Sequence, residues 1–313
     1  MRVPYLFFSD CARGLSQAPF VPGEVEGRGT DPNGVSTEPV PSDAAAGVER
    51  LDTNGRWCPD TPCPHLHPRA LCIAHRPSNK APMIRVASYN IHKAVGTDRR
   101  RNPERILAVL NEIDADIIAL QEADRRHGAR VGVIPLAMLE AHSDYVHVPF
   151  NMRAHSLGWH GNAILVRKSA EILWHEPIHI PSLEPRGAVM ADIAIGRHKV
   201  RIVGMHLDLS GLWRRQQARA ILAHVDACET RYPAILMGDL NEWSRQSGCL
   251  RDFGRHYSFA DCGKSFHASR PVATLDRIMV SEGLQVAESG VHHSAVARRA
   301  SDHLPVWAQI KAA

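Results

Sequence analysis

Positions 234–241 hold a short apolar run that ends in a glycine and two polar residues, Ala-Ile-Leu-Met-Gly-Asp-Leu-Asn. Four consecutive apolar residues before a glycine are typical of a buried strand that ends at a turn. Asp239 and Asn241 come directly afterwards, and two residues apart in an extended segment they project to the same side. An aspartate there can accept a proton from water, while an asparagine can donate to a phosphate oxygen. The alternative is an ordinary turn, since Gly, Asp and Asn all suit turns.

Nearly all of a further set of polar residues along the chain stand in the same position, at or just after the end of a short apolar run. Because a folded sheet gathers the ends of its strands at a rim, we expect these side chains to converge. Carboxylates, amides and imidazoles at one rim indicate metal-assisted phosphoester hydrolysis. The residues are Asn90, Glu122, His206, Asp276, Asp302 and His303.

Apolar patterning predicts a layered α/β or α+β fold built on sheets. Residues 84–90 alternate with the two-residue period of a strand. Asn102 can cap a helix that begins at Pro103, because proline suits the first helical position. A second helix is predicted over 212–228. Further strands are predicted at 116–120, 145–148, 163–167, 188–195, 200–205, 234–237, 274–280, 284–291 and 305–310.

Glu122 and His303 are candidates for metal and proton chemistry. A carboxylate inside the core would be costly, so Glu122 is expected at the edge of a sheet, where its oxygens suit Mg²⁺ or Mn²⁺. The alternative is a surface glutamate that starts a loop. His303 can act as acid or base, and Asp276, inside an otherwise apolar strand, is the candidate that orients it. The alternative for Asp276 is a buried ion pair with Arg277.

Further imidazole and cationic side chains complete the predicted set. His206 closes an apolar strand and is a second imidazole candidate, whereas Arg186 and Lys93 can contact phosphate. The chain carries 37 basic and 33 acidic residues, a net charge of +4. That mild excess fits an anionic substrate but falls short of the pI above ~9 that marks a dedicated nucleic-acid binder.

Residues 1–82 differ from the rest in composition, with 12 of the 21 prolines and few periodic apolar runs. We predict either a disordered extension or a start codon assigned too far upstream, since Met83 stands immediately before the first clear strand. The folded unit is then 83–313. A zinc site is an alternative use of the extension, although paired Cys-x-x-Cys spacing is lacking. Its candidate ligands are Cys58, Cys63, His65, His67, Cys72 and His75.

The sequence predicts no targeting signal and no integral membrane segment. The apolar run 3–8 is shorter than a secretory core and far shorter than the ~20 residues of a membrane helix. Seven cysteines, scattered and odd in number, do not form the dense framework of a secreted scaffold. We therefore expect a reducing, cytoplasmic compartment.

Seven short motifs, in order, resemble those of the endonuclease/exonuclease/phosphatase superfamily. This superfamily includes pancreatic-type deoxyribonuclease, apurinic endonucleases, inositol polyphosphate phosphatases and neutral sphingomyelinases, and the resemblance covers residues 84–310. It implies a four-layer α/β/β/α sandwich of two mainly antiparallel sheets, with the site where the loops of both sheets meet. The motifs are Tyr-Asn-Ile-His at 89–92, Leu-Gln-Glu at 120–122, Gly-Asn-Ala-Ile at 161–164, Met-His-Leu at 205–207, Gly-Asp-Leu-Asn at 238–241, Leu-Asp-Arg-Ile at 275–278 and Ser-Asp-His-Leu-Pro at 301–305.

The resemblance also implies a reaction and a metal site. The reaction is in-line attack of water on a phosphoester, with Mg²⁺ or Mn²⁺ neutralising the developing charge. Glu122 is implied as the principal metal ligand, with Asn90 and Asp302 assisting.

The same resemblance assigns the remaining residues to water and phosphate. Asp239 orients or deprotonates the attacking water, and Asn241 contacts the phosphate. His303, supported by Asp276, stabilises the phosphoryl group. His206 matches the second histidine of the deoxyribonuclease-like branch.

Substrate choice is less determined, because one fold hosts many substrates. Abasic-site enzymes usually show Arg-x-Asp-Tyr around the orienting aspartate, whereas this chain has Leu-Asp-Arg-Ile at 275–278. We expect a phosphodiesterase, with nucleic acid preferred as the partner on the charge balance. The alternatives are a phosphomonoesterase, a phospholipid or sphingomyelin-type phosphodiesterase, and a non-catalytic binding protein on the same fold.

Overall fold

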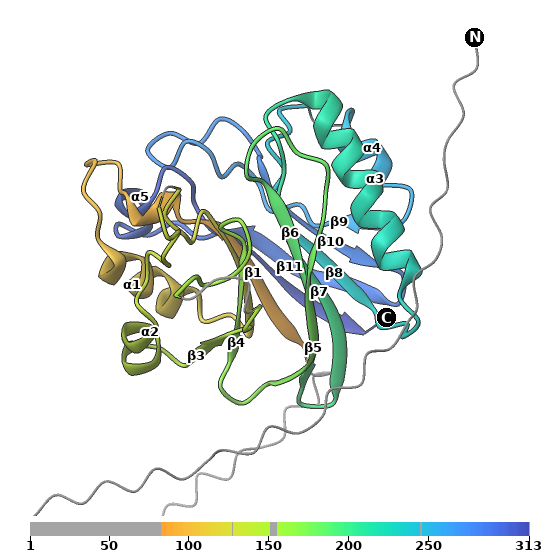
Figure 1. The fold of residues 1–313 in the computed structure, drawn as a ribbon, viewed down its shortest axis with the longest axis horizontal. Coiled ribbons are helices and arrows are strands. Elements are labelled where there is room, and N and C mark those ends of the chain that lie inside the picture. The colour runs from red at the N-terminus through yellow and green to blue at the C-terminus, as the bar shows by residue number, and fades with distance from the viewer. Residues whose placement is uncertain (1–82, 127, 151–154, 245, 313) are drawn as a thin grey trace, which may run out of the picture. The chain divides into compact units, whose positions relative to one another are not determined.

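A computed structural model describes residues 83–312 except 127, 151–154 and 245. Within these residues, two six-stranded sheets form the centre and helices lie to either side of them (Figure 1). The predictions for residues 1–82, including the zinc ligands, lie outside the described residues. In the part of the chain that is described, no helix is long and apolar enough to cross a membrane.

The first sheet has the strand order β11-β12-β1-β2-β4-β3. Its central strands β1 (Ile84–Asn90) and β2 (Ile117–Gln121) run parallel, and the other neighbouring pairs are antiparallel. A parallel pair requires a crossover, which α1 (Pro103–Ile113) supplies. The remaining strands are β3 (Tyr145–His147), β4 (Ala163–Arg167), β11 (Leu284–Val291) and β12 (Val306–Ala312).

The second sheet has the strand order β5-β6-β7-β8-β10-β9. Here β7 (His198–His206) and β8 (Ala234–Asp239) are the parallel pair, connected through α3 (Gly211–Ala227), and the other pairs are antiparallel. The remaining strands are β5 (Glu171–Ile178), β6 (Gly187–Ile195), β9 (Tyr257–Phe259) and β10 (Asp276–Ser281).

Alternating side chains along the strands build three apolar layers. In β2, Ile118 packs under the helices beside the first sheet, whereas Ile117 points into the core between the sheets. In β8, Leu236 packs under α3 and Ile235 joins the central core. Both faces of each sheet are therefore covered, and the predicted α/β/β/α sandwich is confirmed. The other helices are η1 (His92–Ala94), α2 (Leu136–His142), α4 (Cys249–Phe253) and α5 (Ala297–Ala300).

Strand register brings the predicted polar residues to one end of the sandwich. The parallel pairing sets the end of β1, at Asn90, beside the end of β2, at Gln121. In the second sheet Asp239 is aligned with His206 on one side and with Asp276 on the other. Parallel strands expose their carboxyl ends at the same edge, so each sheet delivers polar groups to this end.

The pattern-based element boundaries agree with the structure to within a few residues, but several short elements were missed. β5 was not predicted because Pro177 and mixed polarity obscure its period. The strand tolerates Pro177 because β5 lies at the edge of the sheet. On the open side of an edge strand a proline, which has no N–H, costs no hydrogen bond between strands. The remaining missed elements are η1, α2, α4, α5 and β9, each of seven residues or fewer.

Candidate active site

Asp239 is the centre of a buried set of polar side chains at the end of β8. Its Oδ2 accepts a hydrogen bond from Asn90 Nδ2 at 2.9 Å, and its Oδ1 accepts one from the Asn241 N–H at 2.9 Å. The Nε2 atoms of His206 and His303 lie 3.4 Å and 3.7 Å from Asp239 Oδ2. Side chains from both sheets therefore meet at one carboxylate.

His303 lies between two carboxylates. Its Nδ1 is 2.8 Å from Asp276 Oδ2, which also accepts a hydrogen bond from Ser265 Oγ at 2.5 Å. Asp276 thus pairs with His303 and not with Arg277, the alternative raised by the sequence. Burial of the ring opposes its charge, but Asp276 and Asp239 raise the pKa of His303 to about 10. The ring is therefore an imidazolium at neutral pH, with a proton on each nitrogen.

His206 faces the same carboxylate but carries no charge at neutral pH. Arg186 Nη1 lies 3.0 Å from His206 Nδ1 and also contacts its Nε2. Burial, together with the charge of Arg186, lowers the pKa of His206 to about 4. Two imidazoles at one aspartate therefore hold different protonation states, as an acid–base site requires.

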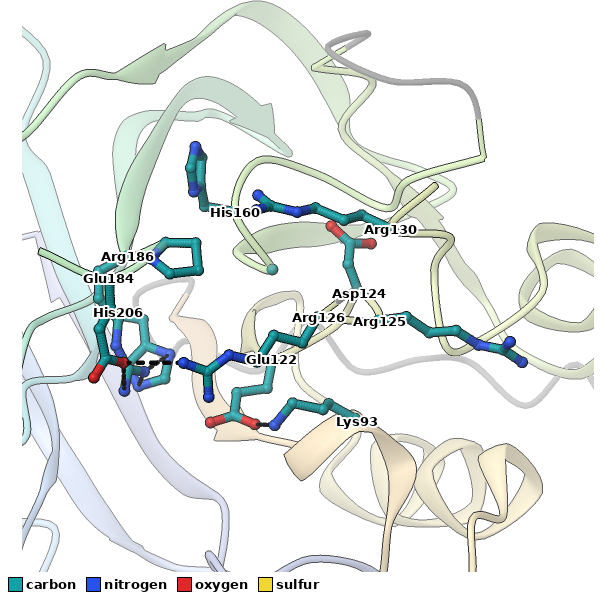
Figure 2. Close-up of a pocket in the computed structure, with 12 residues that line it drawn as sticks. Lys93, Glu122, Asp124, Arg125, Arg126, Arg130, His160, Glu184, Arg186 and His206 are labelled. Carbon is teal, nitrogen blue, oxygen red and sulfur yellow. Dashed lines mark hydrogen bonds and ion pairs between the residues drawn. The ribbon is translucent and has the colours of Figure 1, made fainter. Parts of the chain in front are cut away.

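Glu122 and Lys93 form an ion pair beside this set (Figure 2). Burial would raise the pKa of Glu122, but the cationic groups around it, including Lys93, lower that pKa to about 2. Both residues have a left-handed backbone, with φ of 55° and 57°. Such conformations in non-glycine residues cost about 1–3 kcal/mol each and cluster at functional sites. The carboxylate is therefore ionised and held in a defined position.

Asn241 reaches the site by a different route from the one the sequence suggested. Its φ is 50°, so the segment is not extended there, and the premise for a common side with Asp239 was wrong. Its Nδ2 donates to the Leu207 carbonyl at 2.9 Å, which anchors the amide next to Asp239. Gly238 makes the turn possible, because an added Cβ would lie 1.9 Å from the Met205 carbonyl oxygen.

Asp302 lies next to Asn90 but contacts other groups. Its Oδ1 is 3.7 Å from His92 Nδ1 and 3.3 Å from Ser301 Oγ. Ser301 Oγ also donates to the Asn90 carbonyl at 2.7 Å. The loop that carries His303 is therefore tied to the end of β1.

A cleft beside Glu122 contains residues that the sequence did not single out. Arg126 lies 3.6 Å from Glu184, which also pairs with Arg186 at 3.3 Å. Arg130 extends toward His160, whereas Arg125 points away from Glu122 (Figure 2). The sequence gives one signal for these basic side chains, which is the cluster of arginines that follows Glu122. The cleft is lined by Lys93, Glu122, Asp124, Arg125, Arg126, Arg130, His160, Gly161, Glu184, Pro185, Arg186 and His206.

Within the described ranges of the chain, one group of side chains has the spacing to hold a divalent cation. Ligand atoms of Asp239, Asp276 and His303 lie within 4.8 Å of one another. The two carboxylates can ligate as they stand, whereas the His303 ring can ligate only after it loses a proton. Asp276 Oδ1 is buried and has no hydrogen-bond partner among the described residues, so it has capacity for a cation or a water. Asn90 is hydrogen-bonded to Asp239, and Glu122, which lines the cleft with His206, adds a carboxylate at the same end of the sandwich. Carboxylate and amide oxygens fit hard ions such as Mg²⁺ and Mn²⁺.

The two-sheet sandwich of this protein presents carboxylates, imidazoles and cationic side chains at one end, and it has the phosphoesterase fold. The Endonuclease/Exonuclease/phosphatase family matches residues 87–303. That match spans more than half of the chain, and the chain belongs to this family.

Relatives and solved structures agree with this assignment. "Uncharacterized protein YbhP" of Escherichia coli K12 is 27% identical over 251 residues, which cover 72% of this chain and 96% of YbhP. The endonuclease/exonuclease/phosphatase from Bacteroides vulgatus superposes with a TM-score of 0.60 at 17% identity, covering 74% of this chain and 100% of that one. TDP2 of D. rerio, complexed with a single-strand DNA product, gives 0.57 at 16% identity, with coverages of 73% and 99%. At these identities the two structures establish the fold.

Proposed function

We propose that this protein is a Mg²⁺-dependent phosphodiesterase that cleaves its substrate by in-line attack of water. The observation that carries the proposal is the buried row Asp276, His303, Asp239, in which a cationic imidazole lies between two carboxylates. Such a row supplies a proton acceptor for water and a hydrogen-bond donor for a phosphoryl oxygen in one site.

In the proposed reaction Asp239 orients the attacking water and accepts its proton, while Asn90 fixes the carboxylate. The water oxygen bonds to phosphorus as the bond to the ester oxygen breaks, and the departing alkoxide takes a proton from solvent. The His303 imidazolium donates to a phosphoryl oxygen that gains charge. A divalent ion held by Glu122, with Asn90 and Asp302 assisting, supplies charge neutralisation when bound.

Three side chains are proposed to bind the non-bridging phosphate oxygens. Lys93 and Arg186 line the cleft beside Glu122. Arg186 Nε is buried and, among the described residues, lacks a hydrogen-bond partner, so it is a donor available to an anion. Asn241 uses one amide proton on the Leu207 carbonyl, which leaves the other for substrate.

Nucleic acid and lipid-linked diesters are the two substrate classes to test first. The net charge of +4 supports an anionic substrate of either class. D. rerio TDP2, which has the same fold, was solved with a single-strand DNA product. Phosphomonoesters are the alternative. We also propose a reducing, cytoplasmic location, supported by the free thiols of Cys228, Cys249 and Cys262.

A panel of substrates with Mg²⁺ or Mn²⁺ tests the proposal. We expect the full chain to hydrolyse bis-p-nitrophenyl phosphate but not p-nitrophenyl phosphate. Asp239→Asn is expected to abolish the activity, whereas Asp226→Asn, at an exposed position on α3, serves as the matched control. Equal activity of Asp239→Asn and the control would refute the mechanism. DNA, RNA, abasic DNA and phospholipid arms then rank the substrate classes.

A further inference from the structure

Exposed apolar side chains are concentrated at the catalytic end of the sandwich. Among the described residues, seven large hydrophobic side chains are exposed, and six of them belong to segments at this end. The seventh, Trp174, lies on edge strand β5 and lines a separate pocket with Arg201 and Tyr232. The six are Val131, Leu183, Leu209, Leu212, Trp243 and Val272.

Topology explains why five of these side chains belong to neighbouring segments. Leu183 precedes β6, whose first residue is aligned with His206. Leu209 and Leu212 follow His206 at the end of β7. Trp243 follows Asp239 in β8, and Val272 precedes Asp276 in β10. Because β6, β7, β8 and β10 are neighbours in the sheet, the segments that carry the five side chains follow one another along the edge that carries the catalytic residues. We call these five residues the apolar rim.

Solvent exposure of the apolar rim is high. Leu183, Leu209, Leu212 and Trp243 are between 61% and 67% exposed, and Val272 is 56% exposed. Single exposed apolar residues are ordinary on a protein surface, but a concentration of them beside a functional site marks a surface that contacts a partner.

Charges around the apolar rim favour an anionic partner. Lys264 and Arg270 are exposed on the loop that carries Val272. Of the acids on these loops, Asp208 and Glu242 are buried, and Glu242 pairs with Arg214 at 3.2 Å. Glu184, next to Leu183, is partly exposed but pairs with Arg126 and Arg186. Asp261 is exposed on the loop that carries Val272. The outward charges next to the apolar side chains are therefore mainly basic.

We propose that the apolar rim docks the catalytic end on an anionic phospholipid membrane, so that the site acts on the phosphodiester of a lipid head group. Four of the five side chains are aliphatic, and aliphatic tips enter the acyl boundary while basic groups meet lipid phosphates. Single-stranded nucleic acid would instead be met by aromatic platforms, of which Trp243 is the one example in the rim. The inference rests on the proposed phosphodiesterase function.

Vesicle co-sedimentation of the full chain tests the docking surface separately from catalysis. The vesicles contain phosphatidylglycerol and phosphatidylcholine, and bis-p-nitrophenyl phosphate hydrolysis is measured on the same samples. Leu183→Ser/Leu212→Ser removes two rim side chains outside the catalytic set, and Trp174→Ser is the matched control. All variants retain residues 1–82, so any contribution of that segment is equal in them.

We expect the wild type and Trp174→Ser to sediment with the anionic vesicles and the double variant to partition at least about tenfold more weakly. All three proteins should hydrolyse the soluble diester equally. Hydrolysis without vesicle binding by the wild type would overturn the docking surface and leave the proposed function standing. Equal binding by the double variant would also overturn it. A change in oligomeric state of the double variant without lipid would assign the apolar rim to protein contact instead. Val272→Ser provides a second rim variant if the double variant fails to fold.

Discussion

Asp276→Asn removes the charge that holds His303 as an imidazolium while keeping nearly the same side-chain volume. Coulomb attraction across 2.8 Å is about 6 kcal/mol at an effective dielectric constant of ~20. The rise of the His303 pKa from 6.5 to about 10 corresponds to about 5 kcal/mol. This value is smaller than the Coulomb attraction because burial of the ring opposes part of that attraction. The two magnitudes agree, so the carboxylates, and Asp276 first among them, account for the charge on the ring.

In the Asp276→Asn variant we expect the pKa of His303 to fall by several units toward or below 6.5, because the charge is then favoured by Asp239 at 3.7 Å and by Asp302, without the hydrogen-bonded partner. Diester hydrolysis at neutral pH should fall by about 10² to 10⁴, the range of one proton-transfer or orienting group. NMR titration of the imidazole, metal-free, and initial rates with Mg²⁺ measure the two effects. A His303 pKa still near 10, or a rate close to that of the wild type in a folded variant, would refute the reasoning.

Three further predictions concern stability and reactivity. The folded-state pKa of His303 is raised, so its contribution to stability is fully present below pH 6.5 and is lost as the pH rises through about 10. The difference in unfolding free energy between the wild type and His303→Gln, measured in urea with EDTA, should therefore shrink across that window, and a constant difference would contradict it. Asp192 accepts two hydrogen bonds from the buried guanidinium of Arg201, at 2.7 Å and 2.8 Å. Asp192→Ala leaves that guanidinium without its partner and should lower the unfolding free energy by about 3–5 kcal/mol. A measured loss below about 1 kcal/mol would contradict this prediction. Burial raises the pKa of Cys249 and Cys262 to about 12, so iodoacetamide at pH 8 should modify both only after unfolding, as peptide mass spectrometry can show. Rapid labelling of the native protein would contradict that burial.

Most of the fold followed from periodicity, because the central strands are buried on both faces. β2 and β8 begin with continuous apolar runs, whereas β1 and β7 interleave apolar and polar residues, and the ends of these strands carry the polar residues that the sequence singled out. The short elements α4, α5 and β9 depend on contacts with the sheets rather than on local patterning, so the sequence carried little signal for them.

The candidate site was predictable in composition but not in geometry. The polar residue types and their positions at or inside predicted strands pointed to Asp239, Asp276 and His303. The left-handed turn at Asn241 and the hydrogen bond from Ser265 to Asp276 depend on loops folding back on the sheet. Arg126 and Arg130 join the cleft for the same reason, because their segment is positioned by tertiary packing.

The central claim is that Glu122 anchors a divalent ion at a site for diester hydrolysis. The most direct test is a Mg²⁺ titration of bis-p-nitrophenyl phosphate hydrolysis by the wild type and by Glu122→Gln, after both are stripped with EDTA. We predict no activity without metal, a saturable rise with Mg²⁺ in the wild type, and a half-saturating Mg²⁺ concentration at least about tenfold higher in Glu122→Gln. Metal-independent hydrolysis, or the same half-saturating concentration in both proteins, would contradict the claim.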